Sequence, residues 1–446
     1  MLRRLTGLVR VGLGRRLAVA TVASGGIWVA GTLATFALGV VLARSLGPTG
    51  YGIYGTAIAV VSLVAVPAQL GLPLLATREV SAARSRSRPA EAATLGIWFV
   101  GAVAGASLIL AAALWLAAGV LPLAPALRPA IAAAAMLLPV LALSGLAAGL
   151  LRGQERVVGS QALDVLIRPL LFVAALLAWP RPFGVSGAIG AQSLAAAAIA
   201  LVGLALFFHR TPLGRGSDRP HLRLWTAAAL PMMVLEAMRA LDGSYGVLIA
   251  GYAANLTEAG LLRVALASAM IATVPVSLQN IVVAPFLAGA HAAGENRRLA
   301  RIVAGSTVFM TLAVGAVTLV VAAAGQWAIP LAFGAAFAGA YWPLVLLCFN
   351  QLLAAALGPG VILLSMTGHE RIVVQAFALS VVAAVVTALL LTPRFGAVGT
   401  ASSTIVATVL RGAILNRVAR RRVGVSPSIV GAAGLLRGGS ARASQL

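Results

Sequence analysis

Long apolar runs alternate with short polar connections along the whole chain. Each run has about 20 residues, the length that crosses ~30 Å of hydrocarbon as an α-helix. The first run is too long and too rich in glycine for a cleavable signal peptide, so we expect it to remain as a helix. The pattern predicts twelve membrane-spanning helices, at 17–42, 53–77, 92–118, 129–150, 158–179, 185–208, 225–251, 258–283, 302–325, 340–365, 371–392 and 396–416.

Arginine placement predicts how these helices are oriented. Every basic residue of the chain is an arginine, and there are 33 of them. If the N-terminus lies in the cytoplasm, the cytoplasmic segments carry 25 arginines and the opposite connections carry only Arg44, Arg128, Arg181 and Arg394. This bias is the positive-inside rule. We therefore expect a protein of the bacterial cytoplasmic (inner) membrane with both termini in the cytoplasm.

Three short motifs recur in order at offsets of 208 to 215 residues. GQERVV (153–158) returns as GHERIV (368–373), PRPFGVSGA (180–188) returns as PRFGAVGTA (393–401), and LGPTGYGIYGTA (46–57) is echoed by NLTEAGLLRVA (255–265). The offset matches a unit of six helices used twice. Six helices return the chain to its starting side, so the two copies share one orientation. We predict an all-α polytopic membrane protein with two six-helix lobes related by a parallel repeat and a central cavity between them.

This prediction divides the chain into five parts. Two six-helix lobes make up most of it, with a short linker between them and a basic cytoplasmic segment at each terminus. The predicted bounds are 1–16 for the N-terminal arm, 17–210 for the N-terminal lobe, 211–224 for the linker, 225–418 for the C-terminal lobe and 419–446 for the tail.

Composition excludes several classes of protein. Hydrophobic residues make up 61% of the chain and charged residues only 10%, far fewer than in a soluble globular protein. The net charge of +23 follows mainly from the topology, so we expect no nucleic-acid partner. The single cysteine, Cys348, and four scattered histidines show no metal-ligand spacing, and the chain has no P-loop. No connection exceeds about 20 residues, which weighs against a membrane enzyme, and we expect no cofactor.

Ionisable residues interrupt four of the apolar runs. Five of them lie well inside a run: Asp164, Arg168, Glu236, Arg239 and Asp242. Two more lie nearer the ends of the eighth and twelfth runs: Arg263 and Arg411. At roughly 2.5–3.5 kcal/mol each near the bilayer centre, five lipid-facing charges would cost about 12–17 kcal/mol. These side chains must therefore face the protein interior or water.

Asp164 and Arg168 are one helical turn apart, so they can form an ion pair within their own helix. Pro169 follows and loosens the backbone hydrogen bonding at this point. One interpretation is a structural ion pair that stabilises the first lobe. The other is a contribution to a polar path, and we favour the structural one.

Glu236, Arg239 and Asp242 are spaced three apart and occupy one sector of the seventh predicted helix. One arginine between two carboxylates could form a structural clamp. The spare negative charge instead favours a cavity-lining site for a cation or an anionic head group. Pro231 and Gly243 flank the cluster and suit a helix that bends.

The segment VLARSLGPTGYGIYGTAIAVVSLVAVPAQLGLPLLATREVS (41–81) resembles the opening of polysaccharide-exporting flippases, which belong to the multidrug/oligosaccharidyl-lipid/polysaccharide exporter superfamily. The likeness continues at 242–287 and 330–374, and the LGPTGYGIY block is its most specific part. The resemblance implies two six-helix lobes whose cavity is lined by helices one, two, seven and eight. It also implies movement of polyprenyl-pyrophosphate-linked sugars from the cytoplasmic to the outer leaflet.

The resemblance assigns roles to the charged residues. It implies that Asp164 and Arg168 lie away from the cavity and that five residues line it: Glu236, Arg239, Asp242, Arg263 and Arg44. Because guanidinium groups bind phosphate with two parallel hydrogen bonds, we expect the three arginines to bind the pyrophosphate. Glu236 or Asp242 is the expected coupling carboxylate for H⁺ or Na⁺. The expected partners are the lipid-linked glycan, membrane lipids, the coupling cation and a glycan polymerase.

Other functions remain open at this stage. A lipid II flippase of peptidoglycan synthesis and a cation-coupled multidrug antiporter belong to the same superfamily. The antiporter would show an acidic cavity in the first lobe, and the first two runs contain no buried carboxylate. A polysaccharide polymerase or ligase is disfavoured because the chain has no large outer loop. A scaffold without transport activity would have little use for charges inside the membrane.

Overall fold

The computed structural model describes residues 2–178, 183–209, 211 and 222–432, and this part of the chain is helical with no strand. Nine segments within it are long and apolar enough to cross a membrane. Two of them, Ala23–Gln69 and Glu370–Val423, contain a glycine with non-helical backbone angles, so each holds two helices. Together with α8 (Leu222–Ala253), the segments agree with the twelve predicted spans, and the protein is a multi-pass membrane protein.

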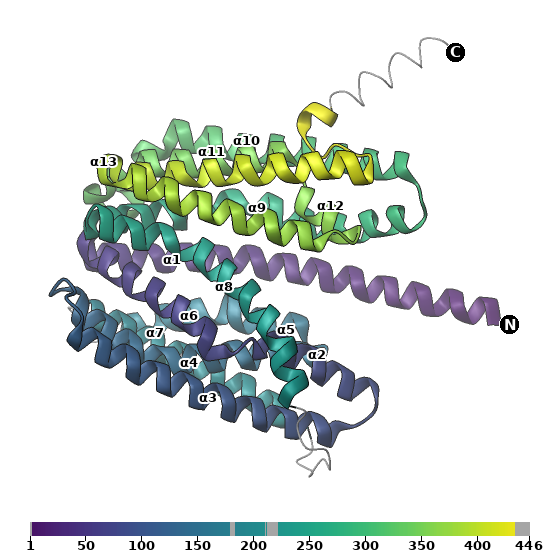
Figure 1. Ribbon diagram of the computed structural model, residues 1–446, viewed down its shortest axis with the longest axis horizontal. Coiled ribbons are helices and arrows are strands. Elements are labelled where there is room, and N and C mark those ends of the chain that lie inside the picture. Colours follow the sequence, from purple (N-terminus) through teal and green to yellow (C-terminus); the bar gives the residue numbers. More distant parts are fainter. Residues whose placement is uncertain (1, 179–182, 210, 212–221, 433–446) are drawn as a thin grey trace.

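The first lobe is a bundle around α4, whose Leu137, Leu138 and Leu146 are fully buried. In Figure 1 it forms the lower half of the molecule, coloured purple to blue. Its elements are α1 (Leu2–Gln69), α2 (Leu72–Ser85), α3 (Pro89–Val120), α4 (Leu127–Gly153), α5 (Val157–Gln161), the π-helix η1 (Ala162–Ile167), α6 (Arg168–Ala178) and α7 (Val185–His209).

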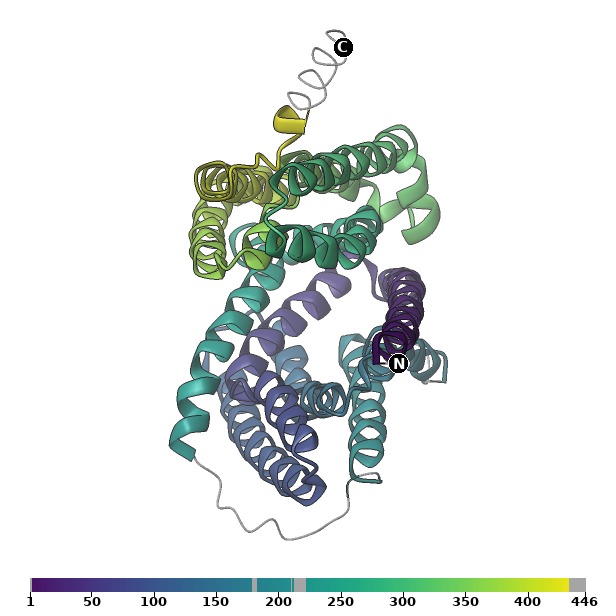
Figure 2. The same cartoon turned by 90° about the vertical axis from the view of Figure 1, so that its right-hand side faces the viewer.

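The second lobe lies above the first in Figure 1, and Figure 2 shows both bundles nearly end-on. Two lobes of this kind are the predicted architecture. After α8 the elements of the second lobe are α9 (Leu256–Ala292), α10 (Asn296–Phe333), the 3-10 helix η2 (Ala335–Ala340), α11 (Tyr341–Leu357), α12 (Gly360–Met366), α13 (Glu370–Val418) and the π-helix η3 (Ala419–Val423).

Large apolar side chains face outward from both lobes. Ile109, Leu319 and Leu390 are 71%, 73% and 70% exposed, on α3, α10 and α13. A water-soluble protein rarely carries so much apolar surface, whereas lipid tails match it. The 61% hydrophobic composition is therefore shared between the cores of the lobes and their lipid-facing surfaces.

The repeated motifs occupy equivalent places in the two lobes. GQERVV begins at the turn between α4 and α5, and GHERIV begins at the turn between α12 and α13. Phe183 lies two residues before the start of α7, and Phe395 directly precedes the break in α13 at Gly396. Residues 180–182 of the first copy lie outside the described residues. Each pair falls at the same step of a six-helix unit, as the parallel repeat requires.

Single glycines turn the chain where the sequence pattern suggested longer connections. At Gly47 (φ 67°, ψ 175°) α1 breaks for one residue and then resumes as a second helix. Gly396 (φ 55°) does the same in α13, where the Glu258 carboxylate accepts a 2.7 Å hydrogen bond from the amide of Ala397. Glycine adopts a positive φ without the steric penalty of a side chain. The carboxylate satisfies an amide at the start of the resumed helix.

The predicted tail is in part a packed segment of the second lobe. Val425 and Ser428 are buried, and the Thr307 hydroxyl of α10 donates a 2.7 Å hydrogen bond to the carbonyl of Pro427. Residues 433–446 of the tail and 212–221 of the linker lie outside the described residues, as do the side chains of residues 2–22, which include the predicted arm.

Candidate functional site between the lobes

The two ends of the bundle differ in their arginine content. The turns α2–α3, α4–α5, α9–α10 and α12–α13 lie at one end, at the right in Figure 1, which we call the arginine-rich end. The breaks at Gly47 and Gly396 and the α8–α9 turn lie at the opposite, arginine-poor end. By the positive-inside rule, the arginine-rich end is the predicted cytoplasmic end.

The lobes meet most closely where α1 crosses α9 at the arginine-poor end. A Cβ atom on Gly52 would collide with the carbonyl oxygen of Leu256, and a Cβ on Gly260 would collide with the carbonyl oxygen of Pro48. Only glycine permits this backbone contact. The hydroxyls of Thr49 and Thr257 form a hydrogen bond of 2.9 Å across the same crossing.

This crossing is symmetric, because Thr49 and Thr257 are 208 residues apart, as are Pro48 and Leu256. Equivalent residues of the two repeats therefore contact each other, as in an interface between identical subunits. We call this crossing, formed by residues 48–52 and 256–260, the seal.

Arg44 reinforces the seal from α1. Its Nε donates a 2.7 Å hydrogen bond to the carbonyl of Ala332, and its Nη2 donates one of 2.5 Å to the carbonyl of Leu331. Both acceptors belong to the last turn of α10, whose carbonyls attract a positive charge. Phe36 packs edge-on against Phe333 with ring centroids 5.6 Å apart. The structure thus places Arg44, a predicted phosphate ligand, in contact with the opposite lobe.

Arg263 extends from α9 into the first lobe next to the seal. Its guanidinium carbon lies 5.6 Å from the ring centroid of Tyr51 and 5.1 Å from that of Tyr54. Gly55 makes room for it, since a Cβ there would lie 2.6 Å from Arg263 Cδ. The Nε of Arg263 is buried without a hydrogen-bond partner. Sequence reasoning missed the two tyrosines, although their i, i+3 spacing in GYGIYG places them on one helix face.

The helix α8 connects the two lobes. At the arginine-rich end Gly71, which precedes α2, lies against the backbone of Ala229 and Met233 in α8. Towards its other end α8 packs on α13 through a cluster of apolar side chains, Tyr245, Ile249, Ala384, Ala388 and Ala407. In Figure 1, α8 accordingly runs obliquely from one lobe to the other. The predicted boundary at residue 225 therefore falls in a helix that both lobes share.

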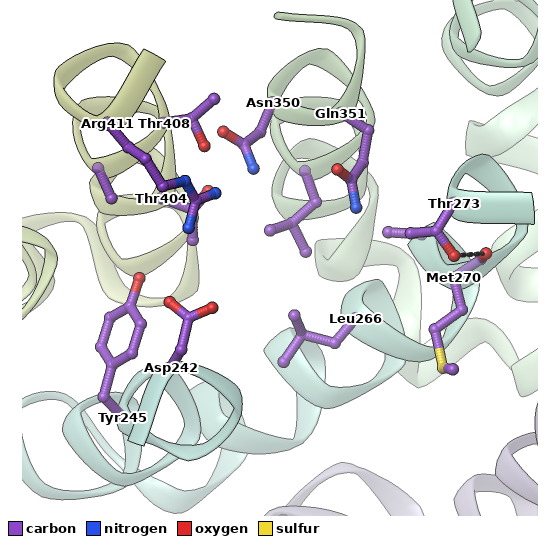
Figure 3. A pocket seen from close by; sticks show the side chains of 13 residues that line it. Asp242, Tyr245, Leu266, Met270, Thr273, Asn350, Gln351, Thr404, Thr408 and Arg411 are labelled. Carbon is purple, nitrogen blue, oxygen red and sulfur yellow. Dashed lines mark hydrogen bonds between the residues drawn. The ribbon is translucent and has the colours of Figure 1, made fainter. Parts of the chain in front are cut away.

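The charged cluster of α8 is divided between two environments. Arg239 and Glu236 are paired, with Nη1 and Oε1 3.3 Å apart, and their side chains are 63% and 38% exposed. Asp242 does not join them and instead faces into the second lobe (Figure 3). Asp242 lies three residues after Arg239, so its side chain is rotated by about −60° around the helix axis relative to that of Arg239. This rotation directs Asp242 towards α11 and α13. Of the two acids that the spacing could bring to Arg239, only Glu236 pairs with it.

A cavity of about 220 Å³ lies inside the second lobe where Asp242 points. Figure 3 shows Arg411 of α13 aiming its guanidinium at Asp242 across this cavity. The guanidinium carbon of Arg411 also lies 5.3 Å from the ring centroid of Phe377. Sequence reasoning did not link Asp242 with Arg411, because 169 residues separate them. The other polar residues of the cavity are Tyr245, Thr273, Asn350, Gln351, Thr404 and Thr408.

The ion pair predicted in the first lobe is present. Arg168 Nη1 lies 2.9 Å from Asp164 Oδ1, across the junction of η1 and α6. The Arg168 guanidinium lies within electrostatic reach of the Tyr54 hydroxyl, which donates a 2.8 Å hydrogen bond to Gln192 Oε1. Tyr54 also contacts Arg263 at the interface between the lobes.

The sequence of this chain matches a known protein family. The sequence profile of a family described as polysaccharide biosynthesis protein matches residues 21–291, more than half of the chain. The chain belongs to this family. The matched residues include the whole seal, Arg263 and the charged cluster of α8. A comparison with curated protein sequences gave no match.

Solved transporters share the fold of this family member. The lipid II flippase MurJ in an inward closed conformation is 9% identical, with a TM-score of 0.71 over 91% of this chain and 87% of that one. An inward-facing multidrug resistance MATE family transporter of the MOP superfamily is 15% identical, with a TM-score of 0.68 over 91% and 98%. An outward-facing conformation of such a transporter is 17% identical, with a lower TM-score of 0.57 over 91% and 95%. Because the sequence identities are this low, the likeness shows the fold alone.

Proposed function

We propose that this protein is a flippase that moves a polyprenyl-pyrophosphate-linked oligosaccharide across the bacterial cytoplasmic membrane by alternating access. Membership of the polysaccharide biosynthesis family supports a glycan cargo. The observation that carries the proposal is the one-sided seal, next to which Arg263 keeps a buried nitrogen without a partner. Under the positive-inside rule the seal is periplasmic, so this state receives cargo from the cytoplasmic leaflet.

The arginines at the interface suit a pyrophosphate head group. Guanidinium groups bind phosphate oxygens with two parallel hydrogen bonds. The Nε of Arg263 has no hydrogen-bond partner and is available to a phosphate oxygen. Arg239 needs to break only its ion pair with the exposed carboxylate of Glu236. Arg44 is engaged with the α10 carbonyls in this state and becomes free for cargo when the seal opens. In the proposal these three arginines bind the cargo in succession.

The proposal assigns coupling to a carboxylate of α8, Asp242 or Glu236. Both lie on the helix that contacts both lobes, so a change in their charge alters how that helix is held. A ligand shifts a conformational equilibrium only through its different affinities for the two states. A cation that binds Asp242 differently in the two arrangements provides such a difference.

Two related functions are distinguished by the cargo. A lipid II flippase would carry the same pyrophosphate on a different sugar, so it shares the arginine chemistry of the proposal. A multidrug antiporter for organic cations is disfavoured, because Arg44, Arg239 and Arg263 repel positively charged cargo. We assign the protein no enzymatic activity.

Deletion of the gene followed by mass spectrometry of lipid extracts tests the cargo. We expect a polyprenyl-pyrophosphate-linked glycan to accumulate, with its sugar protected from added glycosidase in right-side-out vesicles. A deletion strain with an unchanged set of lipid-linked glycans would refute the proposal. A reporter fused after Leu446 tests the orientation, and it should be active only as a cytoplasmic fusion.

Cross-linking the seal tests alternating access. Cysteines at positions 49 and 257 would replace two hydroxyl oxygens that lie 2.9 Å apart, close enough for a disulfide after small adjustments. Oxidation of the Thr49→Cys/Thr257→Cys variant should stop transport, and reduction should restore it. The native Cys348 is buried, so the two single-cysteine variants serve as matched controls. Continued transport through a fully cross-linked protein would contradict opening at this end.

A further inference from the structure

The cavity of the second lobe combines the ligands of a cation site with a positive side chain. Side-chain oxygens line it from α8, α11 and α13, contributed by Asp242, Asn350, Gln351, Thr404 and Thr408. Carboxylate, amide and hydroxyl oxygens are the ligands that hard metal cations prefer. Figure 3 shows the guanidinium of Arg411 directed into the same space.

We propose that the Arg411 guanidinium is the resident cation of this site, and that the coupling cation is therefore a proton taken up by Asp242 rather than a metal ion. The coupling role rests on the proposed flippase function, whereas occupation of the site by Arg411 does not. Asp242 is the only carboxylate among the lining residues, and Arg411 already balances its charge. An added Na⁺ would bring a second positive charge next to the Arg411 guanidinium, and like charges repel each other. A proton that binds the Asp242 carboxylate needs no set of coordinating ligands, and it takes up no additional space in the cavity.

Arg411 has a second partner available when Asp242 is neutral. Its guanidinium carbon lies 5.3 Å from the ring centroid of Phe377, within the range of a cation–π contact. Protonation of Asp242 removes the attraction between α8 and α13, and Arg411 then remains on the ring. Because α8 also contacts the first lobe at Gly71, weakening its attachment to α13 affects how the two lobes are joined.

Among the described residues that line this cavity, no charged group other than Arg411 faces Asp242. On α8 itself, Arg239 and Glu236 are paired with each other, and Tyr245 shares a 3.3 Å hydrogen bond with Ser403. The lining residues of α9 and α11 are all uncharged: Leu266, Ala269, Met270, Thr273, Leu347, Asn350 and Gln351. Arg411 therefore dominates the electrostatic environment of Asp242.

A second cavity gives this site a route towards the arginine-rich end. It has a volume of about 160 Å³ and shares Gln351, Thr408 and Arg411 with the first cavity. Its lining continues past Gly358 to Asn416, which lies near the end of α13. A proton can thus reach Asp242 through the second lobe, past Arg411, without crossing the interface between the lobes.

Thermal unfolding of the full-length protein in detergent tests the proposal without any cargo. Sodium chloride is compared with choline chloride at equal ionic strength. The wild-type unfolding temperature should be the same in both salts. Arg411→Ala vacates the cation position, so saturating sodium should raise its unfolding temperature by at least about 2 °C. Arg411→Ala/Asp242→Asn should lose this response. Arg371→Ala, which removes an exposed arginine from the start of α13, should show none.

Two results would overturn the proposal. One is a sodium response of the wild type that Asp242→Asn abolishes, because a metal ion would then bind beside Arg411. The other is a folded Arg411→Ala or Arg411→Gln variant that does not respond to sodium. If neither variant folds, the wild type and Asp242→Asn still decide the question. These measurements need no glycan, so a negative result leaves the flippase proposal intact, and failure of the deletion experiment leaves the cation site intact.

Discussion

The two lobes share one order of helices but hold their acid–base pairs differently. In the first lobe Asp164 and Arg168 are one turn apart on one length of helix, with their charged atoms 2.9 Å apart. In the second lobe Asp242 and Arg411 belong to different helices and face each other across a cavity. Two charges on one helix move together, so the energy of their interaction does not change when that helix moves. A pair shared by two helices changes its energy whenever they move, so the second lobe is the one suited to coupling.

Removal of each acid gives the largest expected contrast. Asp242→Asn should reduce transport by more than about tenfold, because the switchable charge between α8 and α13 is lost. Asp164→Asn should leave transport within about twofold, since it removes only a local ion pair. Transport is followed as surface glycan produced in a complemented deletion strain, with protein abundance as the control. Equal losses in the two variants would contradict the assignment of coupling to the second lobe.

Exchanging the charges probes the geometry of each pair. Asp242→Arg and Arg411→Asp should each lower transport by more than about tenfold, and the double variant should recover part of it, since contacting residues show coupling energies of about 0.5–3 kcal/mol. The same exchange at Asp164 and Arg168 should change little, because an i, i+4 pair forms in either order. A second-lobe double variant no better than its singles would show that the two groups act independently.

Arg239 provides an intermediate case, since it has a local partner but lies on the helix shared by both lobes. Arg239→Ala should abolish transport at near-normal abundance, and Arg239→Lys should retain part of it, because an ammonium lacks the two-pronged geometry of a guanidinium. Transport assays with quantified membrane protein measure both effects. If neutralising Glu236 and Asp242 restored Arg239→Ala, Arg239 would be a counter-charge rather than a cargo ligand.

The smallest expected effect is on the stability of the first lobe. Replacing Asp164 by Asn and Arg168 by Gln together removes a half-exposed pair worth about 0.3–0.5 kcal/mol in an isolated helix. The unfolding temperature in detergent should fall by no more than a few degrees. A much larger fall would mean that the pair also anchors Tyr54 and Arg263, and so contributes to the interface between the lobes.

The amino-acid sequence by itself determined the local features. Apolar runs long enough to span a bilayer predicted the helices, and an i, i+4 spacing predicted the ion pair of Asp164 and Arg168, because both depend only on the geometry of a single helix. The offset of 208 residues indicated the repeat. It did not show that equivalent residues, Thr49 and Thr257, would contact each other.

Only the tertiary structure decided which charges face each other. Asp242 was expected to pair with Arg239, three residues away, and instead faces Arg411, 169 residues away. Arg263 was predicted to line the cavity, and only the folded chain shows that the tyrosines next to it belong to the other lobe. Contacts of this kind depend on the rotation and tilt of whole helices, which are set by how side chains pack between them. Helical periodicity shows which residues share one face of a helix. The packing of the helices determines which other residues that face contacts.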